Sequence, residues 1–297
     1  MASDEPDGSR HDAEELYKAV QKVISSLSEQ ECFERFPAVP DKLKLQQKLS
    51  RGQPLFVPEQ VKIKKEAAEK AFLLLIDAFR GNLDDISQDI DRLYQAFQDE
   101  EISPLELVDI TVNHYWGKLK SLSLKFSIDP EVFQFFTIYL ARPFRQQVAE
   151  RIWSKDMTGN WNKGYCPVCG HHPVLGRLYG EPARRELWCC CCNTSWEFTR
   201  IGCPVCSNQS QNQLGYLTVE SYPLYRIYVC DKCRRYLKIN IDKSESNTEG
   251  FKYDLEYLAS ASLDQAALAQ GYISEPIWIS RNELSRDLDP EVYSDLK

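Results

Sequence analysis

The first half of the chain alternates apolar and polar residues with the period of an α-helix. Apolar positions recur three or four residues apart in a stripe that begins at Leu16 and in a second stripe that ends at Phe79. Residues 81–100 continue this pattern. We therefore expect a helical domain over residues 13–157, preceded by a disordered tail over residues 1–12.

Two later helices have recognisable features. Ser103 is typical of an N-cap, because Pro104 follows at the first helical position and a glutamate lies three residues after the cap. Apolar positions continue at helical spacing as far as Leu119, which predicts one helix over this stretch. A further helix begins at Asp129 and contains Pro143, where we expect a kink because proline removes a backbone hydrogen bond.

The pattern changes near residue 157, in a stretch rich in glycine, asparagine and serine that is typical of a linker. Short runs of β-branched and aromatic residues follow, and they predict the strands of small hairpins. Apolar positions from Tyr253 to Leu268 then predict one closing helical segment within residues 244–297.

Four C-x-x-C pairs form an internal repeat between these regions. In each half, a leading C-P-V-C pair is followed by nineteen or twenty-three residues and then by a second pair. A C-x-x-C turn places both sulfurs on one side of a tight knuckle, and two facing knuckles supply the tetrahedral four-sulfur shell that zinc or a rubredoxin-type iron accepts. We expect pairing within each repeat rather than an interleaved arrangement of the first and third pairs. The predicted ligands of these two metal ions, Fe or Zn, are Cys166, Cys169, Cys189 and Cys192 for the first and Cys203, Cys206, Cys230 and Cys233 for the second.

Together these patterns predict an α+β protein. An all-helical N-terminal domain is followed by two tandem rubredoxin-like or zinc-ribbon modules, over residues 158–200 and 201–243, and by a short C-terminal helical segment and tail. Each module is too small to fold on an apolar core of its own. Metal binding should therefore supply much of its folding free energy, on the order of 10 kcal/mol per site.

Other candidate chemistry is sparse. Cys190 and Cys191 lie inside the second pair, where C-x-x-C spacing selects Cys189 and Cys192, so we interpret them as spare thiols. His171 and His172 follow the first knuckle, and we expect them at the surface or behind the ligands. The sequence contains no phosphate loop, nucleotide fingerprint or hydrolase motif. We predict no catalytic residues and no enzymatic activity.

The charge balance and cysteine use suggest a compartment and restrict the partners. The net charge is −8, which argues against nucleic acid as the main partner. No apolar run approaches the roughly 20 residues that cross a bilayer, and the first residues are polar and acidic, unlike a signal peptide. Eleven cysteines without an export signal indicate reduced, metal-binding thiols. We expect a cytoplasmic protein.

The cysteine motifs also carry a family resemblance. They read Gly164-x-Cys-Pro-Val-Cys-Gly-x-x-Pro173, Leu187-x-Cys-x-x-Cys-x-Thr-x-Trp196, Cys203-x-x-Cys206 and Cys230-x-x-Cys-x-x-Tyr-Leu-Lys238. In these motifs the chain resembles the formate dehydrogenase accessory protein FdhE family, from which Cys190 and Cys191 depart. The resemblance implies a chaperone-like protein that binds the catalytic subunit of formate dehydrogenase, or of a related exported redox enzyme, and supports its maturation before export.

Two alternative functions stay open at this point. One is electron transfer through rubredoxin-type iron sites. The other is nucleic-acid binding by zinc ribbons, which would use a basic and aromatic set made of Arg184, Arg185, Arg234, Arg235 and Lys238 near Trp188 and Tyr236.

Overall fold

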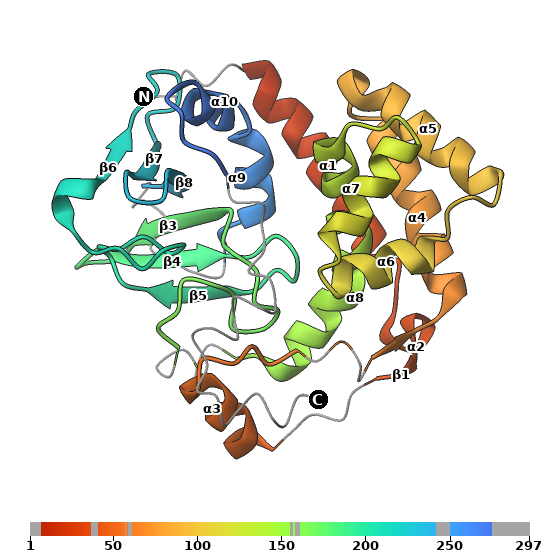
Figure 1. Ribbon diagram of the computed structural model, residues 1–297, viewed down its shortest axis with the longest axis horizontal. Helices are drawn as coiled ribbons and strands as arrows, with labels where there is room; N and C mark the ends of the chain where they lie inside the picture. Colours follow the sequence, from red (N-terminus) through yellow and green to blue (C-terminus); the bar gives the residue numbers. More distant parts are fainter. Residues whose placement is uncertain are drawn as a thin grey trace. The chain divides into compact units, whose positions relative to one another are not determined.

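The computed structural model describes residues 7–36, 41–56, 58, 61–154, 157, 161–241 and 250–274 (Figure 1). The chain divides into two compact units. The helical unit contains His11–Val39 and Phe56–Arg151, and the ribbon unit contains Met1–Arg10, Pro40–Leu55 and Ile152–Lys297. The predicted α+β fold class is confirmed: helices come first, and a sheet-rich part with two four-cysteine clusters follows. The loop at 242–249 and the tail after 274 lie outside the described residues.

The helical unit is built around an aromatic core. Phe72 and Phe79 on α4 each pack edge-on against Phe136 on α8, with ring centroids 5.4 and 5.5 Å apart. The aromatic positions at helical spacing therefore form part of the core of this unit. The elements of this unit are α1 (Asp7–Ser25), α2 (Glu29–Cys32), β1 (Phe33–Arg35), β2 (Lys62–Ile63), α4 (Lys65–Arg80), η2 (Asp84–Ile86), α5 (Ser87–Gln98), α6 (Pro104–Val112), α7 (Trp116–Lys125) and α8 (Pro130–Ile152).

The predicted helix from Ser103 through Leu119 is wrong in one respect, because it is two helices. Ser103 caps α6 as expected, its hydroxyl accepting the Glu106 amide at 3.5 Å. After Val112 the chain turns at His114, whose φ of 61° is left-handed, and the Tyr115 amide donates back to the Ile110 carbonyl at 3.0 Å. This is how helices commonly end, and it separates α6 from α7.

As expected, α8 contains Pro143, and it continues to Ile152, close to the predicted end of the helical pattern. Another helix boundary was not evident from the pattern. α1 begins at Asp7, inside the stretch expected to be a tail. Near its start, the Arg10 guanidinium donates to the Glu256 carboxylate at 2.9 Å. A partner so distant in the sequence cannot be found from local patterning.

The ribbon unit contains one six-stranded sheet with the order β5-β4-β3-β8-β7-β6. All neighbours are antiparallel except β3 and β8, which pair in parallel and join the two modules into one sheet. Gly176 lies on β3 at this junction. A side chain there would meet the Glu186 carbonyl at 2.7 Å and Ile239 at 2.8 Å, so glycine is required. The strands are β3 (Leu175–Tyr179), β4 (Arg184–Trp188), β5 (Ser195–Phe198), β6 (Leu214–Leu217), β7 (Tyr225–Cys230) and β8 (Arg235–Asn240), with η4 (Gln211–Gln213) before β6.

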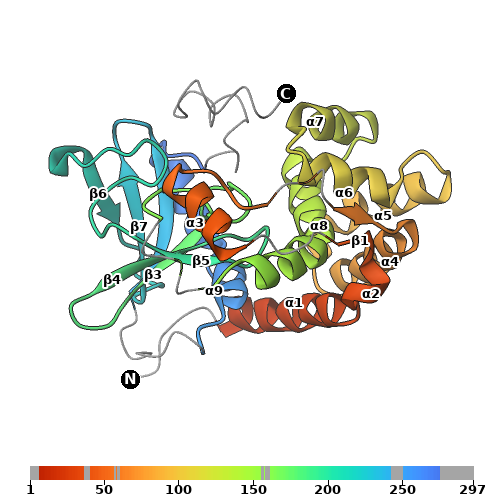
Figure 2. The ribbon, with the colours of Figure 1, turned by 90° about the horizontal axis from the view of Figure 1, so that it is seen from below.

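α3 (Lys42–Ser50) belongs to the ribbon unit, although it precedes most of the helical unit in the sequence (Figure 2). The turn after α3 holds the first knuckle: the Leu55 amide donates to the Pro167 carbonyl at 2.9 Å. The Tyr165 hydroxyl in turn donates to the Gly52 carbonyl at 2.8 Å. A segment from the predicted helical domain therefore supports the cysteine-rich part.

The closing helical segment is broken into α9 (Tyr253–Ala259) and α10 (Ser262–Ala269). Lys238 on β8 contacts the turn between them, where its ammonium group donates to the Ser260 carbonyl at 3.1 Å and to Asp264 at 2.9 Å. The same carbonyl also accepts the Leu263 amide at 3.1 Å, so this turn is tighter than an α-helix. Within the described residues, no helix is long and apolar enough to cross a membrane.

Candidate metal centres

All four C-x-x-C knuckles close with the same backbone turn. The amide of the residue after each second cysteine donates to the carbonyl of the first cysteine, at 2.8 to 3.0 Å. The same residue has a left-handed φ between 56° and 78°, which lets the chain reverse around the two sulfurs. Glycine at one of these positions was a visible signal in the sequence, whereas the other three were not. The four residues are Gly170, Asn193, Ser207 and Arg234.

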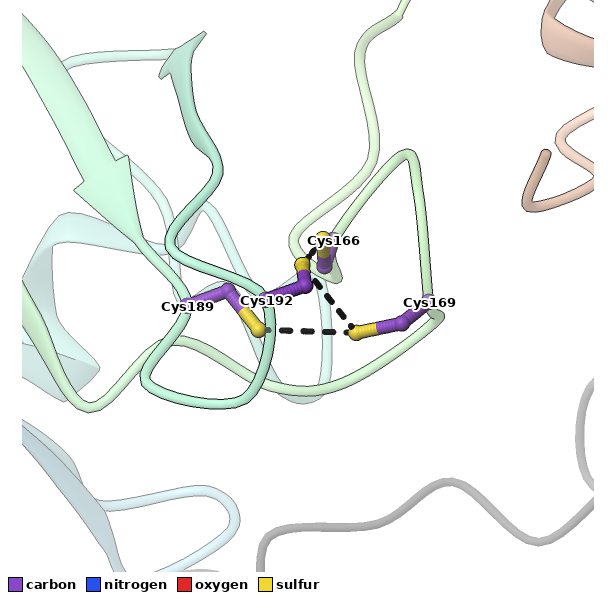
Figure 3. Close-up of side chains that lie close together, drawn as sticks. All are labelled: Cys166, Cys169, Cys189 and Cys192. Atoms are coloured by element: carbon purple, nitrogen blue, oxygen red, sulfur yellow. Dashed lines mark hydrogen bonds between the residues drawn. The ribbon is translucent and has the colours of Figure 1, made fainter. Parts of the chain in front are cut away.

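The first cluster brings together four buried sulfurs from two facing knuckles (Figure 3). Cys166 lies 3.5 Å from Cys192, and Cys169 lies 3.5 Å from both Cys189 and Cys192. A tetrahedral ion with zinc–sulfur bonds of about 2.3 Å would separate its ligands by about 3.8 Å. The four sulfurs thus stand close to the spacing that such an ion requires.

The second cluster repeats this arrangement with more exposure. Cys203 lies 3.6 Å from Cys233, and Cys206 lies 3.7 Å from Cys230. Cys206 and Cys233 are half-buried, whereas their two partners are buried. The structure therefore groups the predicted ligands within each repeat, and each group of four can hold a metal ion.

The thiols of each cluster differ in acidity. Burial raises the pKa of Cys166 and Cys169 well above the ordinary thiol value. At Cys189 burial acts in the same direction, but hydrogen bonds from the neighbouring thiols outweigh it and lower the pKa. In the second cluster, burial raises the pKa of Cys203 to about 11, while hydrogen bonds outweigh burial at Cys230 and lower its pKa to about 7. A divalent ion would ionise the remaining thiols, because coordinated thiols are deprotonated.

The two knuckles that lead each repeat touch one another. A side chain at Gly164 would lie 1.9 Å from the carbonyl oxygen of Pro204, so the backbones at these two positions are in contact. Gly164 precedes the first cluster, and Pro204 directly follows Cys203 of the second. A movement of the backbone at one candidate metal centre should therefore displace the backbone at the other.

The two histidines after the first knuckle are buried, not exposed. The His171 carbonyl accepts the Cys166 amide at 2.7 Å, which holds the chain against the knuckle. Burial, together with the nearby His171 and Arg235, lowers the pKa of His172 to about 3. Cys190 and Cys191 are buried as well.

The basic and aromatic set proposed for nucleic-acid binding does not form an exposed face. Arg185, Trp188 and Lys238 are buried. Arg185 donates to the Gly202 carbonyl at 2.8 Å, and Arg184 pairs with Glu197 at 2.9 Å. Arg184 and Arg234 remain exposed, so the structure separates the set into buried and exposed members and does not present it as one basic surface.

A pocket of about 270 Å³ lies beside the second cluster. Cys203, Cys230 and Arg185 are among the residues that line this pocket. Ile201 and Tyr216 line it with side chains that are 50% and 56% exposed. No pattern in the sequence indicates this pocket, because its walls come from strands of both modules.

Comparison with known proteins gives sequence and structural relatives. No family model matches the chain. A protein FdhE homolog from Aquifex aeolicus is 33% identical over 159 residues, which are 52% of this chain and 54% of that protein. Protein FdhE from Escherichia coli is 32% identical over 115 residues, or 38% and 36% of the two chains. The chain thus spans about half the length of the first relative and just over a third of the second. The crystal structure of the FdhE protein from Pseudomonas aeruginosa matches with a TM-score of 0.52 and 19% identity over 95% of each chain, which shows a shared fold.

A helical region followed by two four-cysteine clusters on one sheet defines a zinc-ribbon-like protein with two candidate metal centres. The clusters also lie in the part of the chain whose motifs carry the family resemblance. In sequence the chain is similar to FdhE proteins over about half its length, and it shares the fold of the FdhE protein from Pseudomonas aeruginosa.

Proposed function

We propose that this chain is a metal-binding, chaperone-like accessory protein without a reaction of its own. In the cytoplasm it would bind the catalytic subunit of a formate dehydrogenase, or of a related exported redox enzyme, and support its maturation before export. The observation that supports this proposal best is the sequence similarity to FdhE proteins together with the two four-sulfur clusters. The ions would be structural, because a closed shell of four thiolates leaves no position for a substrate.

Affinity capture of the tagged full-length chain from its native cytoplasm tests the partner. We expect a formate dehydrogenase catalytic subunit in the captured complex and a loss of formate dehydrogenase activity in cells that lack the chain. The proposal fails if neither result is obtained with a chain that carries its metal.

The eight cysteines are the proposed ligands, and the second cluster offers the simplest test. Replacing Cys203 and Cys206 together with serine should release one metal equivalent and leave the helical unit folded, as measured by metal analysis and circular dichroism. Cys32→Ser is the matched control, because Cys32 is buried in the helical unit with its sulfur 3.5 Å from the Gln147 amide nitrogen. Retention of every equivalent after the double replacement would contradict the assignment.

We place the client contact at the pocket beside the second cluster. Its rim exposes Ile201 and Tyr216, and apolar side chains of this kind commonly anchor protein partners. Ile201→Asp should weaken capture of the client at least tenfold without changing the metal content. Leu43→Asp is the control, since Leu43 is 59% exposed on α3 of the same unit. Equal capture by both variants would exclude this surface.

A rubredoxin-type electron-transfer protein is the second candidate. It is favoured by the half-buried positions of Cys206 and Cys233, which would let a redox partner approach the second ion. A red protein that bleaches reversibly, at a rate that matches turnover of a partner, would support electron transfer. A colourless protein that contains zinc would rule out electron transfer as the function.

A further inference from the structure

The first cluster is surrounded by more metal-binding groups than one ion can use. His171, Cys189 and Cys191 are all buried, and their ligand atoms lie within 4.8 Å of one another. Cys189 belongs to the first four-sulfur cluster as well, so the two groups share one sulfur. A tetrahedral ion takes four ligands, which leaves Cys191 and His171 outside its shell.

The ring of His171 is held as a metal-binding histidine usually is. Its Nδ1 lies 2.7 Å from the carbonyl oxygen of His172. A carbonyl can accept but cannot donate, so Nδ1 carries the hydrogen and, in the neutral ring, Nε2 carries the lone pair. Histidines that bind metals typically fix their tautomer by donating the other ring nitrogen to a backbone carbonyl or a carboxylate.

The charge of the buried cluster favours a second ion at this position. Four thiolates and one divalent ion leave a charge of about −2 in a buried site, where uncompensated charge is unfavourable. A second divalent ion that shares Cys189 and ionises Cys191 would leave about −1. The extra ion therefore lowers the charge that the interior has to hold, although one more thiol is ionised.

We propose that His171, Cys189 and Cys191 bind an additional thiophilic divalent ion, such as zinc, with the sulfur of Cys189 bridging it to the ion of the first cluster. Three protein ligands leave the fourth position for water or a small thiol, and this position should make the additional ion the most weakly held. The proposal rests on the proposed role of the first cluster as a metal site. It adds a third ion to the two expected from the C-x-x-C pairs.

The chain supplies a matched control for each new ligand. Cys190 is a buried neighbour of Cys191, and His172 is a buried neighbour of His171, but neither belongs to the three-residue group. Substitutions at the control positions test burial and packing, whereas those at the ligand positions also remove a bond to the ion.

The experiment is a saturating zinc titration of the reduced full-length chain, with bound equivalents counted after gel filtration. We expect three equivalents for the natural chain, two for Cys191→Ser and for His171→Gln, and three for Cys190→Ser and His172→Gln. A cobalt(II) titration should show a third absorption step that Cys191→Ser removes. Retention of two equivalents by a variant, with unchanged circular dichroism, shows that it is still folded.

The outcomes separate this proposal from the one on which it rests. Two equivalents in the natural chain would overturn the additional site and leave the two four-cysteine sites intact. Fewer than two would overturn the four-cysteine assignment itself. Loss of the third equivalent from Cys190→Ser as readily as from Cys191→Ser would overturn the ligand assignment.

Discussion

The contact between Gly164 and Pro204 predicts that one added methyl group will weaken the second metal centre. In Gly164→Ala the new Cβ would lie 1.9 Å from the Pro204 carbonyl oxygen and 2.4 Å from its carbonyl carbon and Cα. Backbone must therefore move by about 1.5 Å to bring the shortest of these contacts to the 3.4 Å of ordinary packing. Overpacked side chains cost about 1–3 kcal/mol, and displaced backbone belongs at or above the upper end of that range.

The strain falls on the second cluster, because Pro204 directly follows its ligand Cys203. If about 3 kcal/mol is relieved by opening that knuckle, its metal affinity falls by roughly 100-fold. Competition with a chromophoric chelator measures this change. Gly215→Ala is the control, since its Cβ would meet Val229 at an ordinary 3.6 Å within the same module. Equal metal affinity and equal unfolding free energy in the two variants would refute the reasoning.

Three further substitutions test other parts of the ribbon unit. Glu186→Gln should destabilise this unit by about 3–5 kcal/mol in chemical unfolding, because it leaves the buried guanidinium of Arg177, 3.0 Å from Glu186, without its counter-charge. The control is Glu197→Gln, which removes one partner of an exposed ion pair and should cost less than about 1 kcal/mol. Burial lowers the pKa of His172 to about 3, so the stability that its neutral ring contributes is complete above pH 6.5 and is lost as the pH falls from 6.5 toward 3. His172→Gln should therefore flatten the pH dependence of the unfolding free energy in that window. An unchanged acid-unfolding curve would contradict this. Ser207→Val should weaken metal binding at the second cluster measurably, because a β-branched residue is strained by about 1–2 kcal/mol at a φ of 56°; unaltered affinity would show that the turn can relax.

The two groups of four cysteines were predictable because each depends on short-range spacing. A C-x-x-C pair fixes two sulfurs by local turn geometry, and the repeat then indicates which pairs belong together. The same reasoning did not indicate that Cys191 and His171 lie beside Cys189. Spacing selects Cys189 and Cys192 as the knuckle, and it says nothing about the residues that the fold then brings beside them.

The helices were predictable where an apolar stripe is continuous, as in α4, and less so where a tertiary contact ends a helix. At the break between α9 and α10, Lys238 contacts the Ser260 carbonyl from a strand of the sheet, which local patterning cannot reveal. The separation of α6 from α7 depends on a left-handed residue that is not glycine, His114, and the sequence does not mark it. In both cases the helical periodicity of the apolar residues continues through the break, so the pattern does not show where one helix ends and the next begins.

The pairing of β3 with β8 changes how the metal centres should be understood. Sequence patterning divides the cysteine-rich part into two modules, each of which folds around its own ion. The structure instead places both on one sheet, joined by the strands at Gly176 and Ile239 and by the knuckle contact at Gly164. An ion bound in either cluster therefore stabilises strands that the other cluster also needs, so the two ions should bind with positive cooperativity and the ribbon unit should unfold as one piece. The helical unit has an aromatic core of its own around Phe72 and Phe136, and it should stay folded when both ions are removed.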